Sequence, residues 1–209
     1  MYYIMYKLDP KTTLIQYLLF SLLYLLYLCD NRLGLILSVF GLFTAWRLKY
    51  TDNYENTTIL KAYLVISFSV VIFLTVTNTI PKHIFNTTAT WLLMINIFVL
   101  IFSYNSINRQ RLCIIIAILF IVITTPILKY KNNQITMDSN IINKDLWVVL
   151  YTTVLGIFFL TNQKFSMNPN IYLSLFSLLA PMILHFTSNK WLVSRALFLN
   201  LFIFTDLFN

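Results

Sequence analysis

The chain has 209 residues, of which 59% are hydrophobic and only 11% are charged, with a mean hydropathy of +0.76 and a formal net charge of +8. Because a soluble domain carries about 25% charged residues, this composition excludes an ordinary soluble domain and predicts an integral membrane protein. The cations stand in short groups such as RLKY and NRQR, so a nucleic-acid partner is not implied and contacts with lipid headgroups are expected.

Eight apolar stretches, separated by short polar breaks, are each predicted to form a helix. They cover 12–29, 33–48, 59–80, 87–104, 112–128, 146–161, 170–187 and 190–208. A helix needs roughly 20 residues to cross a hydrocarbon core, and stretches that are apolar on every face disfavour a transmembrane barrel. The predicted fold class is all-α: a single domain, 1–209, forming a multi-pass integral membrane helical bundle of about eight transmembrane helices. The alternative is seven spans plus one interfacial helix, because Arg195 lies in the first two turns of the last stretch.

The first stretch is predicted to be retained as a span. The N-terminal residues lack the basic start, short apolar core and small-residue cleavage site of a secretory signal peptide. Basic residues divide almost equally between the two predicted membrane surfaces. The earliest segments, which usually dominate insertion, favour an N-terminus on the cytoplasmic or matrix side.

The second stretch, GLILSVFGLFTAW, carries a narrow stripe of small residues. Gly34, Ser38, Gly41 and Ala45 follow a 4-3-4 spacing, which aligns them on one face of a helix. Small residues let helix backbones approach closely in lipid, so this stripe is predicted to be a helix-packing face. The expected partner is the first stretch, because the connection at 30–32 is short enough to force an antiparallel hairpin.

Three tryptophans predict an interfacial belt. Trp91, Trp147 and Trp191 each stand near the start of an even-numbered stretch, so eight spans would place all three at the same membrane surface. Indole rings favour the headgroup level because they combine an apolar body with an N–H donor. The alternative is that each ring fills the core near a helix end.

Five polar residues lie within apolar stretches and are predicted to be intramembrane polar residues: Asn78, Asn96, Asn200, His185 and Arg195. The asparagines are expected to join helices by hydrogen bonds, with a polar conduction path as the less favoured interpretation. A lone histidine near a helix end is expected to bond a neighbour, although it has the chemistry to titrate or ligate. The polar connection at 129–145 is predicted to be a solvated linker, with partner docking as the alternative.

No catalytic, cofactor-binding or metal-binding pattern emerges from the sequence. The two histidines are not spaced as metal ligands, and Cys29 and Cys113 are expected to be small buried hydrophobic residues. The lack of a carboxylate at mid-span argues against a proton-coupled transporter, and the lack of a mid-span lysine argues against a retinal protein. No cofactor is therefore expected.

The predicted function is that of a non-enzymatic multi-pass membrane protein with a structural or accessory role. Such a role belongs to a subunit of a larger membrane complex or to a viral or organellar membrane component. A small channel or transporter is the alternative, and an intramembrane enzyme would need converging reactive groups at one depth. The expected partners are membrane lipids and other membrane-protein subunits, in an organellar, endomembrane or viral membrane.

Overall fold

The computed structural model describes residues 18, 21–22, 32–34, 36, 38–39, 43, 56–103, 108–132, 134–139, 141–161, 171–188 and 190–205. Within these ranges the regular elements are α3 (Asn56–Val76), α4 (Lys82–Phe98), the 3₁₀ helix η1 (Val99–Ser103), α5 (Arg109–Ile123), β1 (Ile127–Lys131), β2 (Gln134–Asp138), α6 (Lys144–Thr161), α7 (Ile171–Ser188) and α8 (Trp191–Thr205). The described part of the chain is mostly helical, which confirms the all-α class.

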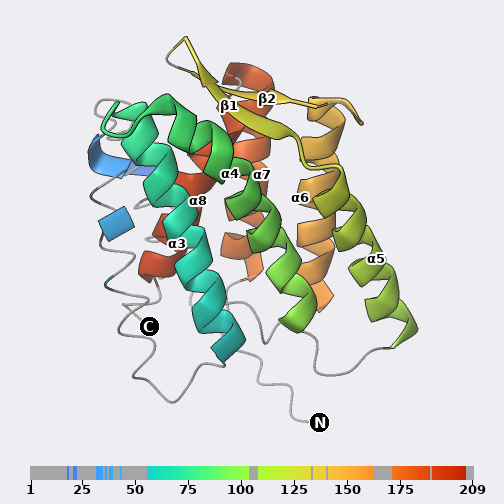
Figure 1. Cartoon of the computed structure of the whole chain (residues 1–209). Coiled ribbons are helices and arrows are strands. Elements are labelled where there is room, and N and C mark those ends of the chain that lie inside the picture. Colours follow the sequence, from blue (N-terminus) through green and yellow to red (C-terminus); the bar gives the residue numbers. More distant parts are fainter. Residues whose placement is uncertain are drawn as a thin grey trace.

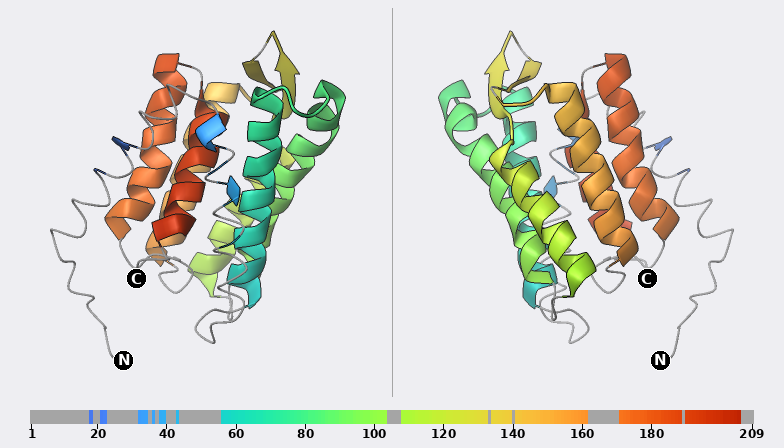
Figure 2. Two further views of the ribbon diagram at one scale, coloured as in Figure 1. Left: turned by 90° about the vertical axis from the view of Figure 1, so that its left-hand side faces the viewer. Right: turned by 90° about the vertical axis from the view of Figure 1, so that its right-hand side faces the viewer.

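The six α-helices among the described residues form a closed bundle (Figures 1 and 2). Each helix packs against the next one along the chain, and α8 returns to pack against α3. The hairpin β1–β2 lies across one end of the bundle, which we call the hairpin end. The starts of α4, α6 and α8 are at this end, because consecutive helices run in opposite directions.

Among the described residues, two helices are long and apolar enough to cross a membrane. They are Lys82–Phe102, with 21 residues, which joins α4 to η1, and Lys144–Thr161, with 18 residues. Ala62–Val76 and Leu175–Ser188 are apolar but shorter. Length and composition of the two longer helices weakly indicate a membrane location, and a bundle of about eight spans stays a prediction.

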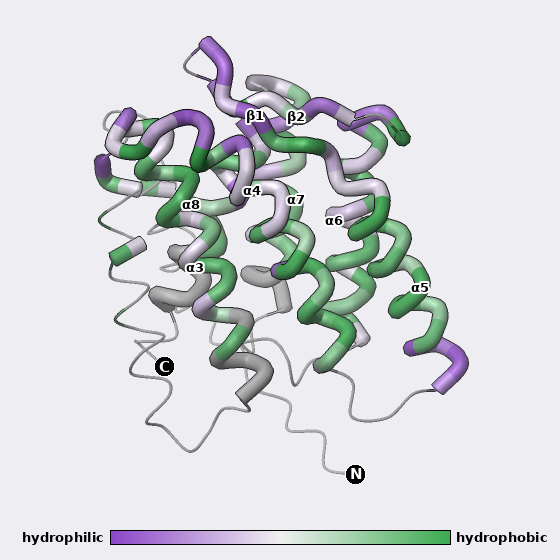
Figure 3. Tube along the Cα trace, in the orientation of Figure 1, coloured by the Kyte–Doolittle hydropathy of each residue, from purple (hydrophilic) through white to green (hydrophobic). Residues whose placement is uncertain are grey.

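The larger of two apolar clusters among the described residues runs through the bundle and receives side chains from α3 to α8. Large side chains such as Phe68, Phe85, Leu93 and Phe158 are almost completely buried there. Large apolar side chains are also exposed on the outside of the bundle. The hydropathy colouring shows apolar residues along much of the described helices (Figure 3). Hydrophilic residues gather at the hairpin end and at the start of α5.

The predicted solvated linker at 129–145 is wrong for much of its length, because the chain forms an antiparallel hairpin there. Leu128 pairs with Met137 and Tyr130 with Ile135, and the side chains of Leu128 and Tyr130 are buried against α4. Two backbone N–H groups of β1 that point away from β2 donate hydrogen bonds to side chains of α4. The Leu128 N–H donates to Thr90 Oγ1 at 2.9 Å, and the Tyr130 N–H donates to Asn86 Oδ1 at 2.8 Å.

Asn78, predicted to lie within an apolar helix, lies beyond the end of α3. Its side chain is exposed and its backbone has φ 55°, a left-handed conformation that asparagine tolerates. The Thr79 N–H donates to Leu74 O at 2.8 Å and the Asn78 N–H to Thr75 O at 2.9 Å. This pair of bonds is a Schellman motif with Asn78 at the left-handed position, and it ends α3 at Val76.

Candidate functional site

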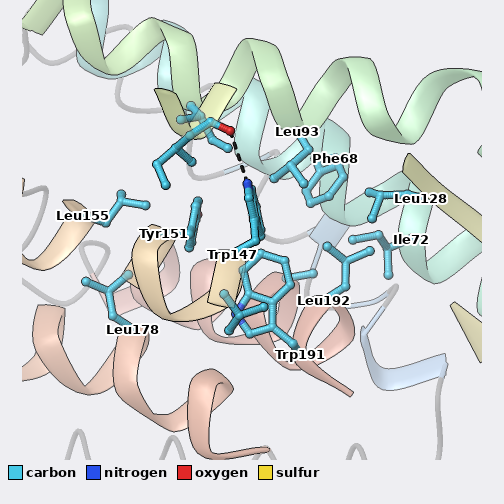
Figure 4. Close-up of a cluster of buried hydrophobic side chains, with 14 of the residues drawn as sticks. Phe68, Ile72, Leu93, Leu128, Trp147, Tyr151, Leu155, Leu178, Trp191 and Leu192 are labelled. Atoms are coloured by element: carbon cyan, nitrogen blue, oxygen red, sulfur yellow. Dashed lines mark hydrogen bonds between the residues drawn. The ribbon is translucent and has the colours of Figure 1, made fainter. Parts of the chain in front are cut away.

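A cluster of aromatic and polar side chains lies where α6, α7 and α8 meet, near the hairpin end. Trp147 and Tyr151 stand four residues apart on α6, and Trp191 and Arg195 stand four residues apart on α8, so each pair shares one face of its helix. The Trp147 and Tyr151 rings are stacked with centroids 5.2 Å apart, and the Trp191 ring meets both edge-on (Figure 4). Edge-on and offset geometries are those that aromatic quadrupoles favour.

The Trp147 indole ties α6 to the end of α5. Its Nε1–H donates to the carbonyl of Ile121 at 3.2 Å, drawn as the dashed line in Figure 4. Ile121 is in the last turn of α5, where carbonyls lack a helical donor. The N–H of Thr125, four residues on, bonds Val122 instead. The Ile121 carbonyl also accepts from the Thr125 hydroxyl at 2.9 Å, so Trp147 adds a donor from a neighbouring helix to a carbonyl at a helix end.

Arg195 performs the same task for α7. Inside a helix the carbonyl of one residue accepts from the N–H four residues later, and for Ser177 that residue is Pro181, which has no N–H. The Arg195 Nη1 donates to the Ser177 carbonyl at 2.6 Å, across from α8. The proline thus creates an acceptor within α7 and the arginine occupies it.

The environment of Arg195 is aromatic rather than acidic. The side chain is 3% exposed, and the guanidinium carbon lies 6.0 Å from the centroid of the Tyr151 ring. Within the described ranges no carboxylate forms an ion pair with Arg195, and its Nε is buried without a hydrogen-bond partner. The ring and the carbonyl are the groups that offset the cost of burying this cation.

His185 joins α7 to α6. Its Nε2 lies 2.7 Å from Oδ1 of Asp145, and the His185 side chain is 1% exposed while that of Asp145 is 49% exposed. Asp145 is in the first turn of α6 and His185 in the last turn of α7, so the helix dipoles favour an anion and a cation at these positions. The Asn143 side chain caps α6 by accepting from the Asp145 N–H at 2.8 Å.

Three contacts connect α5, α6, α7 and α8 in sequence: Trp147 with the Ile121 carbonyl, His185 with Asp145, and Arg195 with the Ser177 carbonyl. We call these contacts the helix ties. Sequence reasoning singled out Trp147, His185 and Arg195 but did not place them together. It missed Asp145 and Tyr151 altogether. The available signal was Pro181, since a proline inside an apolar helix leaves a carbonyl that some other donor must satisfy.

None of the three tryptophans fits the predicted belt of exposed rings near helix starts. Trp147 and Trp191 are 0% and 1% exposed, because their rings pack on each other and on Tyr151, whereas Trp91 is 64% exposed midway along α4. A headgroup belt requires exposed indole rings. Trp147 and Trp191 therefore belong to the core, as the alternative interpretation held.

Of the two remaining asparagines, the structure describes the side chain of Asn96 but not that of Asn200. Asn96 is buried on α4, yet its Oδ1 has no hydrogen-bond partner, so it does not act as the expected interhelical hydrogen bond. The side chain of Asn200 lies outside the described residues. Cys113, expected to be buried, is exposed on α5.

The glycine stripe is described at Gly34 and Ser38, while Gly41 and Ala45 lie outside the described residues. Both described members are buried, and a Cβ built on Gly34 would overlap the ring of Phe73. The Ser38 hydroxyl donates to the Gly34 carbonyl at 2.9 Å. Gly34 therefore packs against α3, and the expected packing on the first stretch falls largely outside the described residues. Phe73 inserts its ring where the glycine has no side chain.

The described residues offer limited chemistry to a ligand. Among them, no three His, Cys, Asp or Glu side chains lie close enough to hold a metal ion. Comparisons with protein-family models, curated proteins and solved structures found no match for this chain. The arrangement holds neighbouring helices together through the contacts of Trp147, Arg195 and His185.

Proposed function

We propose that this chain is a multi-pass integral membrane protein with a non-catalytic, accessory role as a subunit of a larger membrane complex. The observation that carries the proposal is the apolar outer surface of the bundle. On α5 alone, Leu112, Ile116, Phe120 and Ile123 are all substantially exposed, and Ile123 reaches 69%. In water such a surface would drive aggregation, whereas in a bilayer it faces acyl chains or neighbouring subunits.

The helix ties support a structural role. A polar side chain within hydrocarbon is expensive and usually marks a function, yet Trp147 and Arg195 each bond a carbonyl left without its helical donor. Their burial is accounted for by the fold itself, so no reaction has to be invoked for them.

Two experiments test the proposal. Membranes carrying the tagged chain are washed with alkaline carbonate, which should leave an integral protein in the pellet and release a peripheral one. The chain is then purified in mild detergent, where a stable stoichiometric companion is expected. A chain released by carbonate would overturn the membrane assignment, and a chain that purifies alone would overturn the subunit assignment.

A second candidate, a small channel or transporter, is favoured by unused polar atoms on α6 and α8. Thr152 Oγ1, Trp191 Nε1 and Arg195 Nε are buried without a hydrogen-bond partner. Buried groups of this kind are expected to bond water or solute. Reconstitution into liposomes distinguishes the candidates: ion or solute flux that Arg195→Met abolishes would favour transport over the accessory role.

A further inference from the structure

Lysines that are distant in the sequence converge on the hairpin end. Lys82 is the first residue of α4, Lys131 the last of β1, Lys144 the first of α6, and Lys190 immediately precedes α8. Because these elements begin or end at the same end of the bundle, the four lysines share one face of the molecule (Figures 1 and 3). No short run in the sequence contains more than one of them, so only the fold brings them together.

Most of this charge is not neutralised by the described residues. Of the two described acids at this end, Asp138 accepts a hydrogen bond from Lys129 at 2.9 Å and Asp145 contacts His185 at 2.7 Å. The hydrogen bond from Lys129, aided by the charge of Lys131, holds the pKa of Asp138 below its usual range. Lys131, Lys144 and Lys190 make no ion pair with a described carboxylate, and Lys82 lies over the Tyr130 ring, 5.4 Å from its centroid.

Apolar side chains are interleaved with the lysines. Ile127 is 42% exposed, Ile141 is 64% exposed and Leu146 is 51% exposed, and all three lie in the segment from β1 to the first turn of α6. A surface that mixes exposed apolar side chains with long cationic ones suits the boundary between acyl chains and headgroups. A nucleic-acid surface would favour polar and aromatic side chains between the cations.

We propose that the face formed by Lys82, Lys131, Lys144 and Lys190, here called the lysine face, binds the headgroups of anionic phospholipids. The inference rests on the proposed membrane location. The apolar side chains set the depth of the hairpin end, and the lysine ammonium groups then reach the phosphates. Each lysine near an anionic surface strengthens binding roughly fivefold at low salt.

The test uses the full chain in detergent micelles that contain equal amounts of phosphatidylcholine and phosphatidylglycerol. The immobilised protein is washed, and the two lipids that remain bound are quantified by mass spectrometry. Wild type should retain an excess of phosphatidylglycerol that declines at about 0.5 M NaCl, where charges are screened within a few ångströms. The double variant Lys131→Gln/Lys190→Gln should lose most of that excess.

The matched control is Arg109→Gln/Arg111→Gln, which removes the same charge at the start of α5, at the opposite end of the bundle. It should keep the phosphatidylglycerol excess. Equal retention of both lipids by wild type, or equal losses in the two double variants, would overturn the lysine face as the lipid site. Displacement of phosphatidylglycerol by a short single-stranded RNA would overturn it in favour of nucleic acid. A chain that stays in the membrane pellet after the carbonate wash but shows no preference for phosphatidylglycerol would overturn this inference alone. A chain that the wash releases would overturn the membrane location as well.

Discussion

Pro181 and Arg195 both determine which donor the Ser177 carbonyl binds. The proline deprives the Ser177 carbonyl of its helical donor, and the arginine on the neighbouring helix supplies a replacement at 2.6 Å. A carbonyl without a donor is costly in an apolar interior, and so is an arginine without an acceptor. Each residue would be unfavourable alone, and together they tie α7 to α8.

Arg195→Met should lower the stability of the chain in detergent by about 1–3 kcal/mol, because it leaves the Ser177 carbonyl unsatisfied. Pro181→Ala restores an N–H at position 181, so the same arginine substitution should cost clearly less in that background. Thermal or denaturant unfolding of the four proteins in this cycle measures the difference. Arg109→Met, at the exposed start of α5, is the control. Equal losses in both backgrounds would mean that Arg195 acts through Tyr151 rather than through the carbonyl.

Gly34 and Gly156 offer a comparison between two glycines in one protein. A Cβ at Gly34 would overlap the Phe73 ring, whereas a Cβ at Gly156 would meet Leu175 Cδ2 at 3.9 Å, an ordinary contact. Gly34→Ala should therefore destabilise the chain by about 1–3 kcal/mol through overpacking. Gly156→Ala should be neutral or slightly stabilising, since alanine favours the helix. The melting temperatures of the two variants give the answer, and matching values would show that α3 yields to the new methyl group without cost.

At the scale of elements, long stretches of apolar residues could be assigned from the sequence, whereas short strands could not. Long apolar stretches predict helices, and a helix overlaps each of the last six predicted stretches. The hairpin escaped although QITMD alternates between polar and apolar residues, because each strand has only five residues and the first two of ILKYK were assigned to the preceding apolar stretch. Its strands depend instead on Thr90 and Asn86 of α4, a tertiary contact that local sequence does not encode.

The same limit explains the candidate site. His185 and Arg195 could be identified because they are polar residues within apolar stretches. Asp145 lies at a helix start, where acidic residues are common, so its position in the sequence does not indicate a special role. Trp147 and Trp191 do lie near helix starts, but they face the core, because position in a stretch does not say which face of the helix meets the core. Trp91 lies midway along α4, because that helix begins earlier than the sequence predicted.

The hairpin should loosen when its acceptors on α4 are removed. Thr90→Val keeps the shape of the side chain but leaves the Leu128 N–H without its partner at 2.9 Å. Hydrogen exchange in the peptide that covers 127–138 should become faster, while exchange in α6 stays unchanged. Thr153→Val is a suitable control, because the Thr153 hydroxyl bonds only the preceding turn of its own helix. Unchanged exchange in the hairpin would show that the β1–β2 ladder stands without α4.

At the scale of the whole molecule, sidedness follows from the number of spans. With eight spans both termini lie on one side and the hairpin turn on the other. Reporters fused to each terminus and inserted after Asn132 should therefore give matching signals at the ends and the opposite signal in the hairpin. A C-terminal signal that matches the hairpin would instead establish seven spans and an interfacial α8.

The same reporters decide between two expectations of orientation. The earliest charged segments favour a cytoplasmic N-terminus, whereas the lysine face favours placing the hairpin end at the cytoplasmic leaflet, which is the more anionic one. Under eight spans only one of these holds, and the signal from the hairpin reporter says which.

The docking of β1 on α4 also bears on glycosylation. Asn86-Thr87-Thr88 matches the acceptor sequence for N-linked sugars, a modification that suits an exposed surface loop. Here the acceptor asparagine lies on a helix, half-buried, with its amide oxygen held by the Tyr130 N–H. A glycan would be attached to the nitrogen of the same amide whose oxygen binds β1. An unmodified Asn86 is therefore expected in the folded chain whichever compartment it faces, and the lack of a sugar there says nothing about which side of the membrane is luminal.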